Sequence, residues 1–333
     1  MKPPPREPAT LISLEEVREP VEADLDAVIE RMGVVLRGGS PLISDVNGHL
    51  FNMKGKLFRP TLLLLCARAL GRRPPERIRL GGVVELIHLA TLVHDDAIDE
   101  SQLRRGLPTV NAKWSHKVSV IMGDYLYSRA MAEIADSGDL ALISRAAEVT
   151  NAMAVGEMLQ IARGSALETA DEDYFALIGK KTASLIATAC AMGAHLGAPE
   201  HVAELERFGY HLGMAFQIVD DLLDFCGDEE VMGKRPGTDL RELKATLPML
   251  HAYRSADGPD RERLVSAFRT VSLAPDDEEW LVELAAESGG LDYARAAAAR
   301  YADTALASLA TLPPSEELKG MQAAVGYVLQ RER

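Results

Sequence analysis

The chain has 333 residues, and 47% of them are hydrophobic, enough to bury a core and to exclude general disorder. Its formal net charge of −14 argues against nucleic acid as a partner, because binding a phosphate backbone needs a basic surface. The longest plain apolar run, "TLLLLCA", is far shorter than the ~20 residues that a membrane span needs. We therefore expect no transmembrane segment and a cytoplasmic location.

Helical periodicity dominates the chain. Residues 1–10 are proline-rich and lack the apolar stretch of a signal peptide, so we expect a flexible N-terminus. Apolar residues then recur every three or four positions in 15–36, 59–70, 81–99 and 201–225, whereas strand-like alternation is scarce. No internal repeat and no long linker divides the chain. We predict an all-α protein with a single domain over residues 11–333.

The three cysteines predict no metal or redox site. Cys66, Cys190 and Cys226 lie far apart and form no C-x-x-C pair. We interpret them as buried thiols of a protein in a reducing compartment.

Four acids stand at the end of the predicted helix 81–99, within six residues: Asp95, Asp96, Asp99 and Glu100. Asp95 and Asp99 are four positions apart and therefore share a helix face. A solvated acidic surface is the ordinary interpretation of such a run. Here the preceding residues are apolar and two arginines follow, which favours a site that binds cations.

The same D-D-x-x-D spacing recurs in "FQIVDDLLDF", residues 216–225, at the end of another apolar helix. Its acids are Asp220, Asp221 and Asp224. If the two helices face each other, these carboxylates converge on the mouth of one cavity. Oxygen-only ligation favours Mg²⁺, which usually keeps several waters and takes further oxygens from substrate phosphates.

Two other kinds of active site lack support. A di-iron carboxylate bundle takes a Glu-x-x-His motif from each of two helices, and residues 85–88 supply only one. A nucleophilic serine or cysteine lacks its signature, because the sequence has no G-x-S-x-G and no thiol beside a histidine.

Basic residues gather around both acidic motifs, although the chain as a whole is acidic. Each alone is most simply a surface charge, but together they indicate a polyanion site, where Mg²⁺ and cationic side chains would stabilise a departing diphosphate. We expect Lys56 and Arg59 to share one helical face. The full set is Lys56, Arg59, Arg104, Arg105, Lys180, Lys181, Lys234 and Lys244.

From about residue 50 onward the chain resembles the trans-isoprenyl (E-polyprenyl) diphosphate synthases, and most of all those that make medium or long chains. Seven segments occur in the family's order: "GKLFRP", "LVHDDAIDESQLRRGLPTVN", "GDYLYSRA", "GEMLQI", "KKTASL", "FQIVDDLLDF" and "GKRPGTDLRELKATLP". The resemblance implies a terpenoid-synthase helical bundle around a central cavity, and a homodimer. It also implies head-to-tail condensation of isopentenyl diphosphate onto an allylic diphosphate with two or three Mg²⁺, for which Mn²⁺ can substitute.

The resemblance also implies a role for each motif residue. Asp95, Asp99 and Asp220 would hold the metals, with Asp96, Asp221 and Asp224 in support. Lys56, Arg59, His88 and Arg105 resemble the isopentenyl diphosphate site, and Arg104, Lys181, Thr182, Gln217, Lys234 and Lys244 the allylic diphosphate site. Arg104 and Lys181 would also act in catalysis.

Two further expectations concern the same residues. We expect Arg104 and Arg105 to bind two different diphosphates rather than to pair with the aspartates. The family usually has glycine before the last lysine of its second long motif, whereas this chain has Leu243, which we expect to reshape the loop that carries Lys244. The C-terminal third of the chain adds no residue that we would assign to the site.

The residues before Asp95 predict a long product. Short-chain members of the family carry aromatic side chains four and five positions earlier, where this chain has Thr91 and Ala90. Ile87 and Val84, further down the helix, are not aromatic either. We predict a product of about C30 to C50, a quinone side-chain precursor, unless Tyr125, Tyr127 or Met131 closes the tunnel earlier.

Three alternatives remain open. A shorter farnesyl or geranylgeranyl product would need a closed tunnel. A terpene cyclase normally carries an N/D-x-x-S/T-x-x-x-E second metal motif, which differs from the second motif here. A non-catalytic subunit of a heteromeric synthase tends to lose the aspartates, all six of which are present. Release of a long product would involve at most a transient membrane contact.

Overall fold

The computed structural model describes residues 11–53, 55–226, 237–270 and 273–331. Within these residues the protein is helical apart from one small hairpin, in which β1 (Leu103–Arg104) pairs antiparallel with β2 (Leu107–Pro108). The prediction of an all-α fold is confirmed.

The α-helices in chain order are α1 (Leu14–Arg18), α2 (Glu22–Val35), α3 (Pro41–Asn52), α4 (Phe58–Arg68), α5 (Glu76–Ile98), α6 (Val110–Lys113), α7 (His116–Ala135), α8 (Leu140–Arg163), α9 (Asp171–Ile178), α10 (Ser184–Gly197), α11 (Val202–Cys226), α13 (Thr238–Arg241), α14 (Leu247–Ser255), α15 (Gly258–Ala267), α16 (Pro275–Glu287), α17 (Gly290–Ser308) and α18 (Glu316–Gln330). Two 3₁₀ turns, η1 (Glu19–Val21) and η3 (Pro199–His201), and one π-helical turn, η2 (Gly179–Ala183), join some of them.

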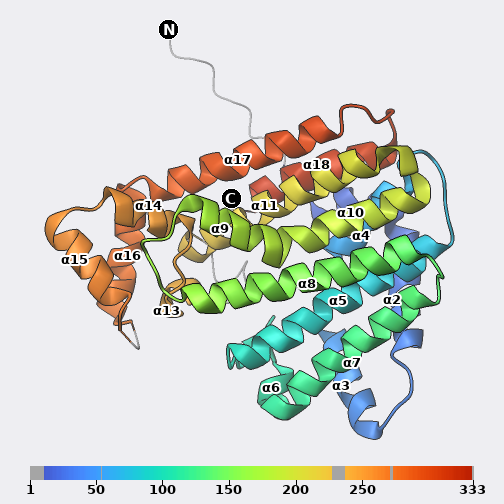
Figure 1. Cartoon of the computed structure of the whole chain (residues 1–333), viewed down its shortest axis with the longest axis horizontal. Helices are drawn as coiled ribbons and strands as arrows, with labels where there is room; N and C mark the ends of the chain where they lie inside the picture. The colour runs from blue at the N-terminus through green and yellow to red at the C-terminus, as the bar shows by residue number, and fades with distance from the viewer. Residues whose placement is uncertain (1–10, 54, 227–236, 271–272, 332–333) are drawn as a thin grey trace.

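The centre of the bundle is α10, which packs against α4, α8 and α11. Figure 1 shows α8 across the front of the molecule, with α17 above it and α7 below it. Glycine lets α10 approach α4 closely: a Cβ at Gly197 would lie 1.7 Å from the carbonyl oxygen of Ala67. No other residue would fit there without moving a helix.

One helical stretch, Asp171–Gly197, is long and apolar enough by composition to cross a membrane, with a mean hydropathy of 1.2. It comprises α9, η2 and α10, and 61% of its most apolar window is buried inside the protein. Such burial is typical of a core helix.

Both acidic motifs lie at the C-terminal ends of long helices. α5 ends at Ile98 and α11 at Cys226, so Asp95 and Asp220 each stand in or near the last two turns. The carbonyl groups at a helix C-terminus carry a partial negative charge, which adds to that of the carboxylates. The fold therefore concentrates negative potential at these two helix ends.

The prediction that the cysteines are buried thiols is confirmed for two of them. Cys66 of α4 and Cys190 of α10 are buried and free. Burial, followed by the nearby Cys190 thiol, raises the pKa of Cys66 well above its usual value. A neutral thiol in such surroundings is unreactive.

Candidate diphosphate and metal site

The three acids of the first motif have different surroundings. Asp95 is largely enclosed, and burial raises the pKa of its carboxyl group to about 6 although Lys181 lowers it. Asp99 follows the last residue of α5 and is exposed. Asp96 is only 4% exposed and points toward Arg104. Asp95 and Asp99 therefore remain the members that can meet a ligand.

Arg104 and Asp96 form a close ion pair. The Arg104 Nε atom donates to Asp96 Oδ1 at 2.8 Å and to Oδ2 at 2.9 Å, and Nη2 lies 2.8 Å from Oδ1. The expectation that neither arginine pairs with an aspartate is therefore wrong for Arg104. Two-point contact of this kind fixes the guanidinium plane. Arg105, in contrast, donates from Nη1 to the carbonyl oxygen of Met53 at 2.8 Å.

In the second motif, Asp220 is the member that faces outward. Its side chain is 42% exposed, and its Oδ1 accepts a hydrogen bond from Nη2 of Arg331 at 3.1 Å. The Arg331 guanidinium lies 4.6 Å from the ring centroid of Phe216, while its Nη1 is buried without a hydrogen-bond partner among the described residues. The sequence offered only a basic end of α18 as a signal, so our prediction missed this residue.

Asp221 and Asp224 point into the protein. Asp221 is 6% exposed and accepts hydrogen bonds from Tyr174 and Gln217. Burial, together with the charge of Asp239, raises the pKa of Asp221 to about 7. Asp224 is fully buried and accepts from the backbone N–H groups of Thr238 at 3.1 Å and Asp239 at 2.7 Å, at the start of α13.

A group of arginines surrounds one acid behind the first motif. Glu85 of α5 is buried, and burial raises its pKa although Arg59, Arg105 and Arg18 act in the opposite direction. Burial lowers the pKa of Arg59 to about 10, and its Nε has no hydrogen-bond partner among the described residues. A buried N–H without a partner is costly unless a ligand accepts from it. The arrangement suits an anion.

His88 stands among the same arginines, one turn from Glu85 on α5. Burial, followed by the charges of Arg59, Arg105 and Arg104, lowers its pKa well below the usual 6.5. The imidazole is therefore neutral at pH 7 and can offer a hydrogen bond to a phosphate oxygen without adding charge.

The position of Lys56 differs from our prediction. Helix α4 begins at Phe58, after Leu57 takes a left-handed conformation with φ 46°, so Lys56 and Arg59 do not share a helical face. The Lys56 ammonium instead lies 5.9 Å from the ring centroid of Tyr327 on α18. The N-terminal end of α4 and the C-terminal helix thus meet at this side of the site.

Lys181 and Thr182 lie on the π-helical turn η2, a geometry common at functional sites. Lys181 Nζ donates to Gln160 Oε1 at 3.0 Å and pairs with Glu157 at 2.5 Å. The turn approaches α8 closely, because a Cβ at Gly156 would lie 2.7 Å from the backbone nitrogen of Lys181. The "GEMLQ" segment therefore supplies a glycine for packing and two side chains that hold Lys181.

Lys244 pairs with Asp239 and Glu242 of its own loop and also lies within reach of the charge of Asp99. Burial lowers its pKa, but the charges of Asp239, Glu242 and Asp99 outweigh that effect and raise it. Leu243, where the family usually has glycine, adopts the left-handed conformation with φ 54°. The loop thus keeps a backbone suited to glycine at a cost of roughly 1–2 kcal/mol. Lys234 lies outside the described residues.

The residues predicted to line the product tunnel follow one side of α5. Val84, Ile87 and Ala90 are buried, while Thr91 is partly exposed and donates from Oγ1 to the carbonyl oxygen of His88. Helix α7 packs along α5, and its three candidate plugs are all half-buried: Tyr125, Tyr127 and Met131.

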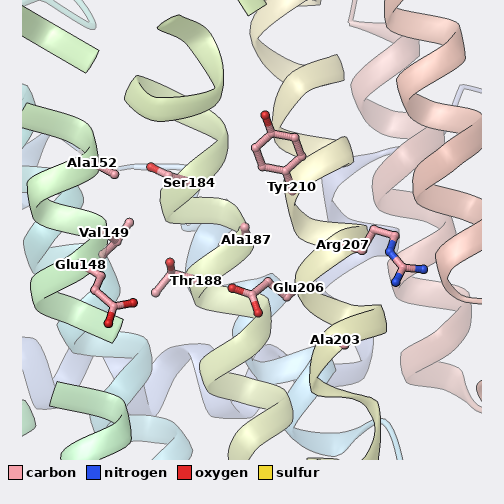
Figure 2. Close-up of a pocket in the computed structure, with 10 residues that line it drawn as sticks. All are labelled: Glu148, Val149, Ala152, Ser184, Ala187, Thr188, Ala203, Glu206, Arg207 and Tyr210. Carbon is pink, nitrogen blue, oxygen red and sulfur yellow. The ribbon is translucent and has the colours of Figure 1, made fainter. Parts of the chain in front are cut away.

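A groove of about 490 Å³ opens elsewhere on the molecule, between α8, α10 and α11. Figure 2 shows three of its lining residues on three helices: Glu148 of α8 at the left, Thr188 of α10 in the middle and Tyr210 of α11 to the right. None of the six motif aspartates lines this groove. It is therefore separate from the site described above.

Comparison with known proteins identifies the family to which this chain belongs. The family model described as polyprenyl synthetase matches residues 40–285. The chain belongs to the polyprenyl synthetase family. It is 33% identical to the octaprenyl diphosphate synthase of Escherichia coli over 324 residues, covering 97% of this chain and 100% of the relative.

Solved structures agree with the family assignment. A decaprenyl diphosphate synthase from Rhodobacter capsulatus is 35% identical, with a TM-score of 0.91 over 96% of this chain and 100% of that one. A polyprenyl synthase from Caulobacter crescentus, solved with calcium and isoprenyl diphosphate, is 32% identical, with a TM-score of 0.93 over 98% of this chain and 100% of that one. The predictions of the isoprenyl synthase fold and of a long-chain trans-polyprenyl diphosphate synthase are confirmed.

Proposed function

We propose that the two acidic motifs and the arginines around Glu85 form one active site, which joins isopentenyl diphosphate to an allylic diphosphate. The observation that carries this proposal is Arg59, which feels the charges of Glu85 on α5, Asp220 on α11 and Arg105 after the first motif. One residue of α4 thus lies within electrostatic reach of Asp220 in the second motif and of Arg105, which follows the first motif.

The proposed reaction breaks the bond between C1 and oxygen of the allylic substrate, and its electron pair leaves with diphosphate. The double bond of isopentenyl diphosphate then attacks the allylic cation, and loss of a proton completes the new unit. Released diphosphate is the base in this scheme, so no general base of the protein is required. Lys181 and Arg104 would hold the allylic diphosphate, and Arg59, Arg105 and neutral His88 the isopentenyl diphosphate.

We assign the metal sites to Asp95, Asp99 and Asp220. Among the described residues, no three acidic, histidine or cysteine side chains are already grouped around a metal position. Mg²⁺ nevertheless suits these residues, because it accepts carboxylate oxygens from few protein ligands and keeps waters or phosphate oxygens for the rest. When bound, it would supply positive charge to the leaving diphosphate.

The product range of about C30 to C50 rests on small and aliphatic residues below Asp95. Ala90 and Ile87 are buried on α5 and offer no aromatic side chain that would stop a growing chain. A quinone side-chain precursor is the use that we assign to such a product. A farnesyl or geranylgeranyl product, the alternative that the sequence left open, would require Tyr125, Tyr127 or Met131 to close the path, and the long-chain relatives do not favour it.

A homodimer is proposed from an exposed apolar surface on α7 and α8. The connection at residues 136–139 is short, and the two helices diverge from it, with the end of α5 between the start of α7 and the end of α8 in Figure 1. These parts of the two helices carry the exposed side chains Val120, Ile121, Val155, Met158, Leu159 and Ile161. A second copy would cover them, in keeping with the family resemblance.

The remaining assignments follow the same resemblance. We propose that residues 11–333 act as one domain in the cytoplasm, where buried free thiols such as Cys66 stay reduced. Contact with a membrane would be transient and would serve product release.

The test combines the purified protein with Mg²⁺, isopentenyl diphosphate and farnesyl or geranylgeranyl diphosphate. We expect extended polyprenyl diphosphates, no product after chelation of the metal, and a dimer by light scattering. Sizing the dephosphorylated products separates the long-chain from the short-chain assignment. Absence of any extended product with every primer would refute the catalytic assignment, and a cyclic hydrocarbon would indicate a cyclase.

A further inference from the structure

A chain of hydrogen bonds leads from Tyr174 to the residues assigned to the allylic diphosphate. Tyr174 Oη donates to Asp221 Oδ2 at 2.6 Å, and Gln217 Nε2 donates to Asp221 Oδ1 at 2.7 Å. At the other end, Thr182 Oγ1 donates to Gln217 Oε1 at 2.7 Å. The four side chains come from α9, α11 and η2, so these hydrogen bonds join three elements of the fold.

Each bond in this chain determines the direction of the next. Asp221 accepts from the nitrogen of the Gln217 amide, which is therefore turned toward it. That leaves the Gln217 oxygen for the hydroxyl of Thr182, which is thereby held in one rotamer. Tyr174 is 3% exposed and so lies behind the site rather than at its surface. A buried network of this kind is rigid as long as every member has its partner.

The backbone of η2 is fixed independently of these side chains. Two helices pack closely against the turn at glycine residues. A Cβ at Gly156 of α8 would lie 2.7 Å from Lys181 N, and one at Gly213 of α11 would lie 2.6 Å from Ala183 Cα. The turn therefore has little freedom to move as a whole. What remains adjustable is the orientation of its polar side chains.

We propose that Tyr174 is a positioning residue for the allylic diphosphate. It holds Asp221, which holds Gln217, which in turn orients the Thr182 hydroxyl beside Lys181. Asp221 is then part of the support behind the site, and Asp220 is the member of the second motif that faces the ligands. This inference rests on the proposed function and adds to it a residue that no motif contains.

Tyr174→Phe tests the proposal, because it keeps the ring and removes one donor. A tenfold loss of affinity corresponds to about 1.4 kcal/mol, the order expected when a group that binds substrate is slightly displaced. We expect the KM for the allylic diphosphate to rise about tenfold and kcat to fall, while the KM for isopentenyl diphosphate stays unchanged.

Tyr293→Phe is the matched control. Tyr293, on α17, also donates to an aspartate of α9, Asp171, but takes no part in the hydrogen bonds that join Tyr174 to Thr182. We expect both variants to lower the melting temperature and only Tyr174→Phe to change the kinetics. Equal kinetics in the two variants would show that Tyr174 has a structural role alone and would overturn the proposal.

Two further measurements make the result independent of turnover and of stability. Calorimetry with inorganic diphosphate and Mg²⁺ should give a Kd raised about tenfold in Tyr174→Phe and unchanged in Tyr293→Phe, even for an enzyme without turnover. In a double-mutant cycle with Asp221→Asn, the Tyr174→Phe effect should largely disappear, because Tyr174 acts through Asp221. Fully additive effects, or an unchanged Kd, would contradict the inference.

Discussion

Arg331 and Asp220, 111 positions apart in the chain, meet at 3.1 Å between Nη2 and Oδ1. The C-terminal helix α18 is thereby joined to the second acidic motif. Because Asp220 is also the outward-facing member of that motif, the guanidinium would compete for its carboxylate with the metal ion that we propose there. The remaining buried nitrogen of Arg331, Nη1, has no hydrogen-bond partner among the described residues and can donate to a phosphate oxygen.

The first prediction concerns this arginine. Arg331→Met keeps a long side chain over the Phe216 ring and removes the charge. We expect activity to fall about tenfold and the free energy of unfolding to change by less than about 1 kcal/mol, because Asp220 is half exposed. Lys319→Met, which removes an exposed ion pair on the same helix, should leave activity unchanged. A steady-state assay and a urea titration of both variants decide; full activity in Arg331→Met would contradict the prediction.

The second prediction concerns the contact between α8 and η2. In Gly156→Ala the new methyl group would lie 2.7 Å from Lys181 N, so the turn must shift. We expect a loss of activity of about 10- to 100-fold, since small displacements of substrate-binding groups cost that much. Gly48→Ala, with no atom within 4 Å of the new Cβ, should instead stabilise α3 by about 0.5–1 kcal/mol and leave activity intact. Wild-type kinetics in Gly156→Ala would show that η2 tolerates displacement.

The third prediction concerns the neutral histidine. The pKa of His88 is lower in the folded protein than its ordinary 6.5, so below pH 6.5 the unfolded chain takes up a proton that the folded chain does not. His88 therefore leaves the free energy of unfolding unchanged above pH 6.5. Below pH 6.5 it lowers that free energy as pH falls, by up to about 1.4 kcal/mol per pH unit. Glu85, whose pKa is raised, acts in the opposite direction.

Comparison with a variant separates the two groups. In His88→Asn we expect the free energy of unfolding, measured by urea titration between pH 7 and pH 5, to fall less steeply than in the wild type. Glu85 is present in both proteins, so it does not affect the difference. Parallel curves would mean that His88 is protonated as easily in the folded protein as in the unfolded chain.

The fourth prediction concerns product length. Ala90→Tyr places an aromatic ring on α5 five positions before Asp95, and we expect a shorter product by chromatographic sizing. Arg79→Tyr, at the far end of the same helix, should leave the length unchanged. Circular dichroism must show that Ala90→Tyr is folded, because Ala90 is buried. An unchanged length in the folded variant would place the tunnel floor elsewhere, with Tyr125, Tyr127 and Met131 as the next candidates.

Periodicity and repeated acids were enough to predict the helical fold and the two motifs. Helix length and apolar spacing are local properties of the sequence, and α5 and α11 extend over the expected segments. The left-handed residue Leu57 could not be predicted in this way, because a leucine rarely adopts that conformation. Lys56 therefore lies outside α4 instead of on its face.

The supporting residues of the site were beyond the reach of sequence patterns. Tyr174 occurs in "DEDYFAL" and Arg331 in "LQRER", and neither segment differs from an ordinary helix surface or end. Tyr174 contacts Asp221, 47 positions away, and Arg331 contacts Asp220, 111 positions away. These contacts give the two residues their roles. Such partners depend on tertiary packing, which one sequence without its fold does not reveal.

The two D-D-x-x-D motifs have the same sequence pattern, but their aspartates have different contacts and therefore different roles. Asp96 is engaged by Arg104, Asp221 by Tyr174, and Asp224 by the first backbone N–H groups of α13. We expect substitutions of the two groups of aspartates to have different effects. Replacing an inward-facing carboxylate should first weaken the scaffold, whereas replacing Asp95, Asp99 or Asp220 should leave a sound fold that has lost affinity for its metal and diphosphate.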